Sequence, residues 1–222
     1  MNFEANLNKI EEKIRDFRYS LVGISKTKPI YMLEEAYQAG LRLFGENKVQ
    51  ELVEKQEQLP EDIQWHMVGH LQSNKVKYIA PFVSLIHAVD SLKLLKEINK
   101  QALKNERVIN CLLQIHIAEE DSKFGLDFDE AEKILIGGEL SSLKNIKIKG
   151  FMGMATNTSD EEQIRMEFRG LKLFFDDMQI IVEHPQVELS TLSMGMSGDY
   201  QIALEEGSNM IRVGSSLFGS RA

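Results

Sequence analysis

Two lysines end the first strongly apolar stretch of the sequence, LVGISKTKPI at residues 21–30. Lys26 and Lys28 follow residues that predict a buried strand, and Pro29 closes the stretch. Because an ammonium group loses its hydration on burial, a lysine here is either solvated at a strand end or held in a pocket. A partly desolvated lysine sheds its proton more easily and then attacks carbonyl compounds.

Two loops near the end of the sequence combine glycines with hydroxyl side chains, in the segments SMGMSGD and IRVGSS. Ser197 precedes a helical stretch that Gly207 closes, so we expect its hydroxyl to cap that helix beside free backbone N–H groups. Gly214 lets the backbone approach a ligand, and Ser215 adds a hydroxyl. Each loop alone is more simply a cap or a turn, but together they predict an anion site, because barrels commonly bind phosphate after strands seven and eight.

Arg212 lies inside an apolar segment, between Ile211 and Val213. Strand residues alternate between two faces, and a barrel encloses both, so a guanidinium there needs an acceptor unless its head reaches water at the strand end. The lysine, the anion site and Arg212 together suit a ligand with an aldehyde, a phosphate and a ring acceptor. Pyridoxal 5′-phosphate (PLP) has all three. An arginine at the pyridine nitrogen would disfavour ring protonation and weaken the ring as an electron sink.

Eight apolar segments predict strands, and a helical stretch separates each from the next. They span residues 18–25, 41–45, 63–69, 83–90, 107–117, 146–154, 187–194 and the start of 209–219. This alternation predicts parallel strands with crossover helices, either closed as a barrel or open as a doubly wound sheet. A length of 222 residues fits a lean barrel. We therefore predict an α/β fold, a single (β/α)8 TIM barrel forming one domain over residues 1–222, with an extra N-terminal helix at about residues 2–17.

Composition excludes several classes of function. The net charge of −8 and the isoelectric point near 5.3 argue against a nucleic-acid partner or an anionic membrane surface. Cys111 is the single cysteine, and His66 and His70 have no third ligand at a useful spacing, so we predict no metal site. The N-terminus lacks the apolar core of a signal peptide, and no apolar run reaches the length of a membrane span, so we expect a cytoplasmic protein.

Seven stretches resemble the pyridoxal phosphate homeostasis proteins, single-domain relatives of the alanine racemase barrel. They are GISKTKP, LRLFGENKVQE, WHMVGHLQSNK, IHAVDS, KFG at 123–125, GFMGMA and LSMGMSGDYQIALEEGSNMIRVGSSLFG. Spacing alone leaves the choice between Lys26 and Lys28 open, and the resemblance implies Lys26 as the lysine of the Schiff base. It also implies that Arg212 faces the pyridine nitrogen. The further residues that it implies around the phosphate or along the cofactor are Ser197, Gly214, Ser215, Asn47 and Met196.

The resemblance implies a PLP-binding protein of intracellular vitamin B6 and amino-acid homeostasis, with no catalytic residues and no robust activity. PLP-dependent apo-enzymes are the partners expected of a protein that hands PLP over. The alternatives are a PLP-dependent amino-acid racemase or decarboxylase and a plain phosphate-binding barrel. Racemisation needs a base on each face of the α-carbon, and racemases that resemble this barrel take a tyrosine from an added C-terminal β domain. Because the sequence ends at Ala222, we favour the binding protein and expect a monomer.

Overall fold

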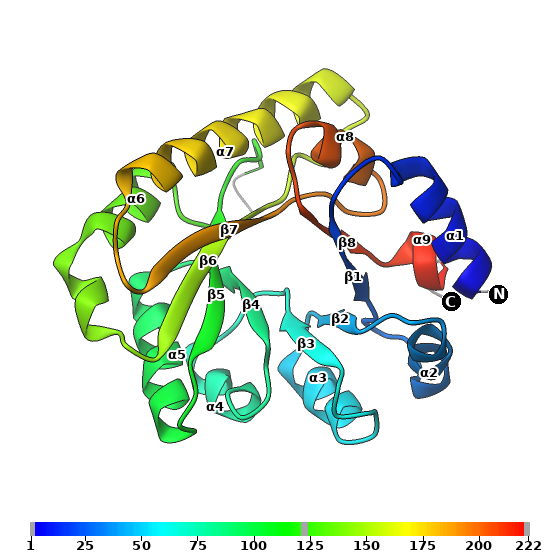
Figure 1. Ribbon diagram of the computed structural model, residues 1–222, viewed down its shortest axis with the longest axis horizontal. Coiled ribbons are helices and arrows are strands. Elements are labelled where there is room, and N and C mark those ends of the chain that lie inside the picture. Colours follow the sequence, from blue (N-terminus) through cyan, green and yellow to red (C-terminus); the bar gives the residue numbers. More distant parts are fainter. Residues whose placement is uncertain (1–2, 121–123, 220–222) are drawn as a thin grey trace.

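Eight parallel strands close into a barrel in the computed structural model, which describes residues 3–120 and 124–219 (Figure 1). Their order around the barrel is their order along the chain, and β8 pairs with β1 to close it. The strands are β1 Ser20–Ile24, β2 Leu43–Glu46, β3 Gln64–Met67, β4 Leu85–Val89, β5 Ile109–Ile115, β6 Ile146–Gly153, β7 Val187–Ser193 and β8 Met210–Val213. The predicted (β/α)8 barrel is confirmed. Residue 2 of the predicted N-terminal helix and Lys123 of the KFG stretch lie outside the described residues.

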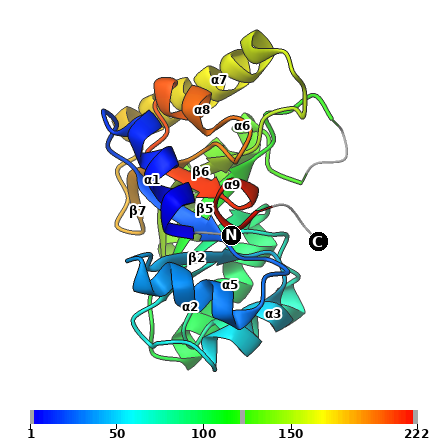
Figure 2. The same cartoon turned by 90° about the vertical axis from the view of Figure 1, so that its right-hand side faces the viewer.

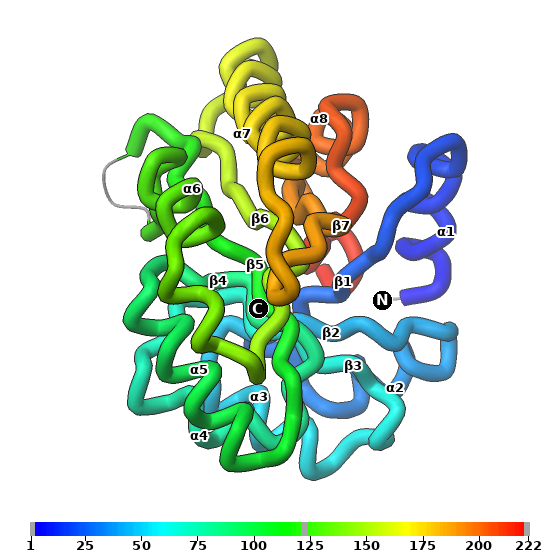
Figure 3. The backbone as a smooth tube through the Cα atoms, turned by 60° about the vertical axis from the view of Figure 1, so that its left-hand side comes forward, coloured from blue at the N-terminus to red at the C-terminus, as the bar shows by residue number. Residues whose placement is uncertain are grey.

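Helices connect successive strands and surround the barrel, as the tube in Figure 3 shows. They are α1 Phe3–Ile14, α2 Ile30–Gln38, α3 Val49–Gln56, α4 Val76–Ile79, α5 Leu92–Lys104, α6 Phe128–Ile136, α7 Glu161–Ile181, α8 Tyr200–Glu205 and α9 Ser215–Phe218, with 3-10 turns η1 Ser73–Lys75 and η2 Gly138–Ser142. Among the described residues, none of these helices has both the length and the apolar character needed to cross a membrane.

The N-terminal helix α1 packs outside the barrel against the short last helix, α9 (Figure 2). The rings of Phe3 and Phe218 lie 5.3 Å apart, and the Asn6 side chain donates a hydrogen bond of 2.9 Å to the Leu217 carbonyl. The helix ends at Ile14, three residues before the predicted end, because the chain turns there toward β1. The first and last helices therefore lie together beside the β8–β1 pair.

Alternation along the strands divides the buried side chains into two sets. Outward residues such as Phe44 and Ile211 join the helices in a large core outside the barrel. Inside the barrel lies a smaller apolar cluster of Val22, Ile24, Leu85, Ala88, Leu112, Met152 and Met210. Toward the carboxyl ends of the strands, buried polar side chains replace apolar ones, namely His66, His87, Ser193 and Arg212. The polar end of the barrel is the end at which the βα loops lie.

Candidate functional site

A cavity of about 350 Å³ lies at the carboxyl ends of β1, β7 and β8. Its described lining consists of Ile24, Lys26, Lys28, Met196, Ser197, Gly198, Arg212, Gly214, Ser215 and Gly219. Six of the seven residues predicted to bind the cofactor are in this lining, and Asn47 is not. Asn47 directly follows β2, and its backbone packs closely against Gly69. A Cβ added to Gly69 would lie only 2.5 Å from the Asn47 carbonyl oxygen. The structure thus brings the lysine, the arginine and the two serine loops together.

Strand β1 directs Lys26 toward the cavity. Val22 and Ile24 belong to the cluster inside the barrel, whereas the Ser25 hydroxyl contacts Glu46 outside it. Lys26 therefore takes the next inward position and lines the cavity above Ile24. The strand ends at Ile24, one residue before the predicted end, so that Lys26 lies in the turn that follows the strand.

A buried ion-pair cluster lies behind this turn. Lys55 of α3 donates hydrogen bonds of 2.7 Å to Glu46 Oε1, to Glu51 Oε1 and to the Ser25 carbonyl, and the Ser25 hydroxyl donates one of 2.6 Å to Glu46 Oε1. Burial raises the pKa of the Glu46 carboxyl above its ordinary value, although Lys55 and Ser25 act in the opposite direction. Sequence reasoning missed Lys55, whose spacing of four residues from Glu51 was the available signal.

The turn itself has an unusual backbone. Thr27 has a φ of 63°, in the left-handed region that a β-branched residue rarely adopts. Its N–H donates a hydrogen bond of 2.5 Å to Glu51 Oε1, which ties this conformation to the ion-pair cluster. Lys28, on the far side of the turn, also lines the cavity, and its Nζ donates a hydrogen bond of 2.9 Å to the Gly219 carbonyl. The backbone is therefore held before Lys26 at the Ser25 carbonyl and after it at the Thr27 N–H.

Arg212 is a buried cation with neutral acceptors. Its side chain is in the barrel, and the residue is 4% exposed. Its guanidinium donates to the Ser193 carbonyl at 2.8 Å, to Ser193 Oγ at 2.7 Å and to the Gly153 carbonyl at 3.0 Å. Within the described residues it forms no ion pair with a carboxylate; burial lowers its pKa to about 10, and Asp199 acts through space in the opposite direction. The predicted buried acceptor exists, and the head of the side chain does not reach out to water.

The loops after β7 and β8 are joined through Ser197. Its Oγ accepts hydrogen bonds from the backbone N–H groups of Gly214, at 3.2 Å, and Ser216, at 3.3 Å. The prediction that Ser197 caps the following helix was wrong, because α8 begins at Tyr200 and Asp199 occupies the N-cap position. Instead, two backbone N–H groups converge on the Ser197 hydroxyl beside the cavity, and an anion that used these donors would replace that oxygen atom.

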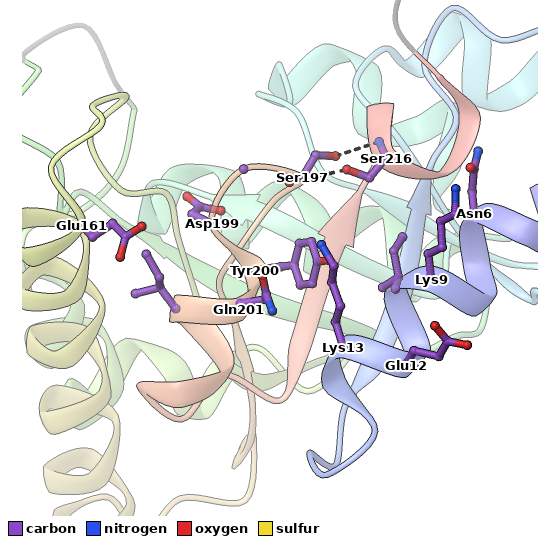
Figure 4. Close-up of a pocket in the computed structure, with 13 residues that line it drawn as sticks. Asn6, Lys9, Glu12, Lys13, Glu161, Ser197, Asp199, Tyr200, Gln201 and Ser216 are labelled. Carbon is purple, nitrogen blue, oxygen red and sulfur yellow. Dashed lines mark hydrogen bonds between the residues drawn. The ribbon is translucent and has the colours of Figure 1, made fainter.

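A second cavity of about 440 Å³ lies on the other side of the Ser197 loop (Figure 4). Figure 4 shows Lys9 and Lys13 of α1 and Tyr200 of α8 around it, with Ser197 and Ser216 joined by hydrogen bonds at its edge. Tyr200, which the sequence places close to the anion site, lines this second cavity. It does not line the cavity that contains Lys26.

The two histidines spaced by four residues have separate surroundings. His66 is inside the barrel, where its Nδ1 lies 3.0 Å from His87 Nε2, and burial lowers the pKa of His66 to about 4. His70 Nδ1 lies 3.0 Å from Asp90 Oδ2, and its ring stacks on Phe124. In residues 3–120 and 124–219, no group of three or more His, Cys, Asp or Glu side chains is placed to hold a metal ion.

Several known proteins are similar to this chain in sequence or in fold. The family model for the alanine racemase N-terminal domain matches residues 1–222. A pyridoxal phosphate homeostasis protein from Aquifex aeolicus is 39% identical over 90% of this chain and 86% of its own length. One from Haemophilus influenzae is 34% identical over 100% of this chain and 97% of its own.

Solved structures agree with this assignment. PipY of Synechococcus elongatus, solved with PLP bound, has a TM-score of 0.85 at 33% identity and covers 98% of this chain and 100% of its own. An alanine racemase from Clostridium difficile shares the fold, with a TM-score of 0.80 at 16% identity over 99% of this chain and 57% of its own. The chain therefore belongs to the pyridoxal phosphate homeostasis proteins, within the family of the alanine racemase N-terminal domain.

Proposed function

We propose that the protein binds PLP in the Lys26 cavity and serves PLP and amino-acid homeostasis without robust catalysis. The observation that carries this proposal is the meeting of an amine, a buried cation and two converging backbone donors around one cavity. Its volume of about 350 Å³ lies in the range of small-ligand sites. The PLP bound to PipY and the names of the curated relatives support the same ligand.

Each part of the cavity suits one part of PLP. When bound, PLP supplies an aldehyde that condenses with a primary amine. Lys26 is the proposed amine, because β1 directs it inward and the ion-pair cluster fixes the turn around it. Arg212 would donate a hydrogen bond to the ring nitrogen. Ser197, Gly214 and Ser215 would hold the phosphate through hydroxyl and backbone donors, and Met196 would pack along the ligand.

Asn47 has a weaker case than the other six residues. It lies at the carboxyl end of β2, outside the described lining of the cavity. We keep it as a proposed contact at the rim, reached only by a ligand that extends beyond the lining. Substitution by alanine should therefore change PLP affinity less than any substitution in the lining, as equilibrium titration would measure.

The cavity favours a binding protein over a racemase. A racemase needs an acid/base group on each face of the α-carbon. Among the described residues of the lining, Lys26 and Lys28 are the two amines, both come from the β1–α2 loop, and no tyrosine, histidine or carboxylate joins them. Steady racemisation of L-alanine by the purified protein at an enzyme-like rate would overturn this part of the proposal.

The remaining parts of the proposal concern the cell. We propose that the protein acts in the cytoplasm as a monomer and passes PLP to PLP-dependent apo-enzymes. Release of the aldehyde would break its bond to Lys26, and either water or the lysine amine of the receiving enzyme would take the place of Lys26. Light scattering would measure the oligomeric state. Recovery of activity in an apo-enzyme mixed with the PLP-loaded protein, faster than spontaneous release allows, would measure transfer.

The decisive experiment locates the attachment of PLP. The protein is mixed with PLP, reduced with borohydride and digested, and the modified lysine is identified by mass spectrometry. We expect modification of Lys26, lost in Lys26→Ala and kept in the matched variant Lys28→Ala. Modification of Lys28 would contradict the choice of lysine. Reversible binding of PLP that inorganic phosphate displaces, with no modified lysine, would favour the plain phosphate-binding barrel.

A further inference from the structure

A chain of buried hydrogen bonds crosses the inside of the barrel and ends at Arg212. Arg212 of β8 contacts Ser193 Oγ of β7 at 2.7 Å, and Ser193 Oγ lies 3.1 Å from His87 Nδ1 of β4. His87 Nε2 lies 3.0 Å from His66 Nδ1 of β3. The four residues are at most 4% exposed, and neither histidine lines the Lys26 cavity. The function proposed above leaves Ser193 and both histidines without a role.

The chemistry of Arg212 gives this chain a direction. A guanidinium only donates hydrogen bonds, so Ser193 Oγ accepts from Arg212 and retains its own hydrogen. His87 Nδ1 is the acceptor within reach, which puts the proton of a neutral His87 ring on Nε2. That N–H then donates to His66 Nδ1, so His66 also carries its proton on Nε2. In each hydrogen bond of the chain, the donor is therefore the group nearer to Arg212 and the acceptor is the group farther from it.

Both rings remain neutral in this arrangement. A protonated His87 would present an N–H to the same serine oxygen that already accepts from Arg212, and would add a second positive charge in the barrel. Burial and the charges of neighbouring groups hold the pKa of His87 well below its ordinary value, and burial lowers the pKa of His66 to about 4. A neutral acceptor is therefore always available to the serine hydroxyl at physiological pH.

His87 acts on Arg212 by selecting the rotamer of the Ser193 hydroxyl, which contacts both residues. Two of the contacts of Arg212 are with backbone carbonyls, which the strands hold in place. The third is with a hydroxyl that can rotate, and the bond to His87 selects the rotamer that presents a lone pair to Arg212. Three of its five N–H groups are used in this way, and because Arg212 also lines the cavity, we infer that the other two are within reach of a ligand there.

We propose that His87 is a positioning residue which, through Ser193, fixes the guanidinium of Arg212 for its contact with the ring of PLP. The proposal rests on the function proposed above, because it assumes that PLP occupies the Lys26 cavity. His87 does not line that cavity, yet in this proposal it controls the strength of the hydrogen bond between Arg212 and the ring nitrogen of PLP. The absorption spectrum of bound PLP responds to that hydrogen bond and is the readout.

The direction of the chain is tested first, without PLP. Long-range nitrogen–proton NMR spectra distinguish the two neutral tautomers of histidine from each other and from the charged ring. We expect both His66 and His87 to be neutral with the proton on Nε2. A proton on His87 Nδ1 would overturn the inference whether or not the protein binds PLP, so this result is independent of the proposed function.

The second test uses variants of His87 loaded with PLP. We expect His87→Leu, which lacks an acceptor, to shift the absorption band and to weaken PLP binding about five- to tenfold. His87→Asn, which keeps an acceptor near the Nδ1 position, should recover at least half of the spectral shift. Leu112→Ala, which opens a cavity in the apolar cluster of the same barrel, should leave the spectrum unchanged.

The outcomes separate the two proposals. A folded His87→Leu with the wild-type spectrum and affinity overturns the role of His87 and leaves PLP binding intact. A wild-type protein without modified lysine overturns PLP binding instead. If His87→Leu does not fold, Ser193→Ala removes the same link while both other side chains remain. We expect it to reproduce the spectral shift, and a wild-type spectrum in Ser193→Ala would also overturn the inference.

Discussion

Lys55 and Arg212 are both buried cations at the same end of the barrel, yet their partners differ in charge. Lys55 contacts two carboxylates, Glu46 and Glu51, and one carbonyl. Arg212 contacts two carbonyls and one hydroxyl, and no described residue forms an ion pair with it. The positive charge of Lys55 is cancelled where it lies, whereas that of Arg212 is only solvated by neutral dipoles.

This difference suggests separate roles, with Lys55 stabilising the fold and Arg212 available to a ligand. A cation paired with carboxylates stabilises the fold only as long as both partners are present, because a lone buried charge is costly. A cation held by neutral acceptors keeps a field that an electron-rich ligand can use. We therefore expect substitutions at Lys55 to act mainly on the free energy of unfolding, and substitutions at Arg212 to lower the affinity for PLP as well.

The largest expected effect is that of Lys55→Met. It leaves the Glu46 carboxylate buried without its cation, and such losses lower the free energy of unfolding by about 3–5 kcal/mol. Urea unfolding measures this change, and Lys48→Met, an exposed lysine next to α3, is the matched control. The double variant Lys55→Met with Glu46→Gln should recover much of the loss. Equal losses in the single and double variants would contradict the charge argument.

The pH dependence of stability tests whether His66, in the hydrogen-bond chain that begins at Arg212, is neutral in the folded protein. The folded pKa of His66, about 4, lies below the unfolded value of about 6.5. Between these values the unfolded chain binds a proton that the folded chain does not, so stability is full above pH 6.5 and falls as the pH decreases. The loss attributable to His66 is about 3 kcal/mol by pH 4.

The variant His66→Gln isolates this contribution from that of the carboxylates. Urea unfolding at a series of pH values should show a shallower loss of stability between pH 6.5 and 4 in His66→Gln than in the wild type. His184→Gln, which makes the same substitution at a histidine in an exposed contact with Ser141, is the matched comparison. Parallel curves for His66→Gln and the wild type would show that His66 does not titrate as its burial implies.

Arg212→Met should lower both the stability and the affinity for PLP, whereas Lys55→Met acts mainly on the stability. We expect a loss of about 1–3 kcal/mol in the free energy of unfolding, from the buried acceptors left without a donor, and a loss of PLP affinity of about tenfold or more. Arg107→Met is the control, because Arg107 also donates to two backbone carbonyls, of Ala80 and Val83, but lies away from the cavity. Equal PLP affinities for the two variants would contradict the comparison.

The smallest expected effect concerns the packing of the loop after β8. A Cβ on Gly214 would lie 3.2 Å from the Ile24 carbonyl oxygen and 3.3 Å from its Cβ, so Gly214→Ala must push the loop away from β1. We expect a loss of about 1 kcal/mol in the free energy of unfolding. Gly198→Ala, whose Cβ would have no atom within 4 Å, should leave stability unchanged. A loss in Gly198→Ala as large as in Gly214→Ala would show that packing is not the cause.

The order of the elements and most of the site can be read from local patterns. Apolar runs separated by helical periodicity identify the eight strands, and a barrel brings the ends of β1, β7 and β8 together once it closes. For that reason the two lysines after β1, Arg212 and Ser197 could be assigned to one cavity from the sequence, and the family resemblance selected Lys26 over Lys28. The sequence signals suffice because each of these residues lies within a strongly apolar strand or no more than four residues after its end.

Non-local packing determines the features that the sequence did not predict. Whether Asn47 faces the cavity depends on how β2 is rotated, and a change of one residue reverses the face. The contact of Ser197 with the loop after β8 depends on the pairing of distant segments, whereas helix caps are local. The burial of Lys55 depends on how α3 packs beneath the Lys26 turn, and the contact of His66 with His87 on how β3 and β4 are paired.

The pairing of β8 with β1 also has a consequence for synthesis on the ribosome. The cavity takes Lys26 from near the start of the chain and Arg212 from near its end, and α1 packs on α9 beside them. Because translation proceeds from the N-terminus, the amine emerges long before the arginine and the loops that complete its surroundings. If the proposed function holds, a growing chain exposes Lys26 without its partners, and the cavity for the aldehyde forms only after β8 has been synthesised and has paired with β1.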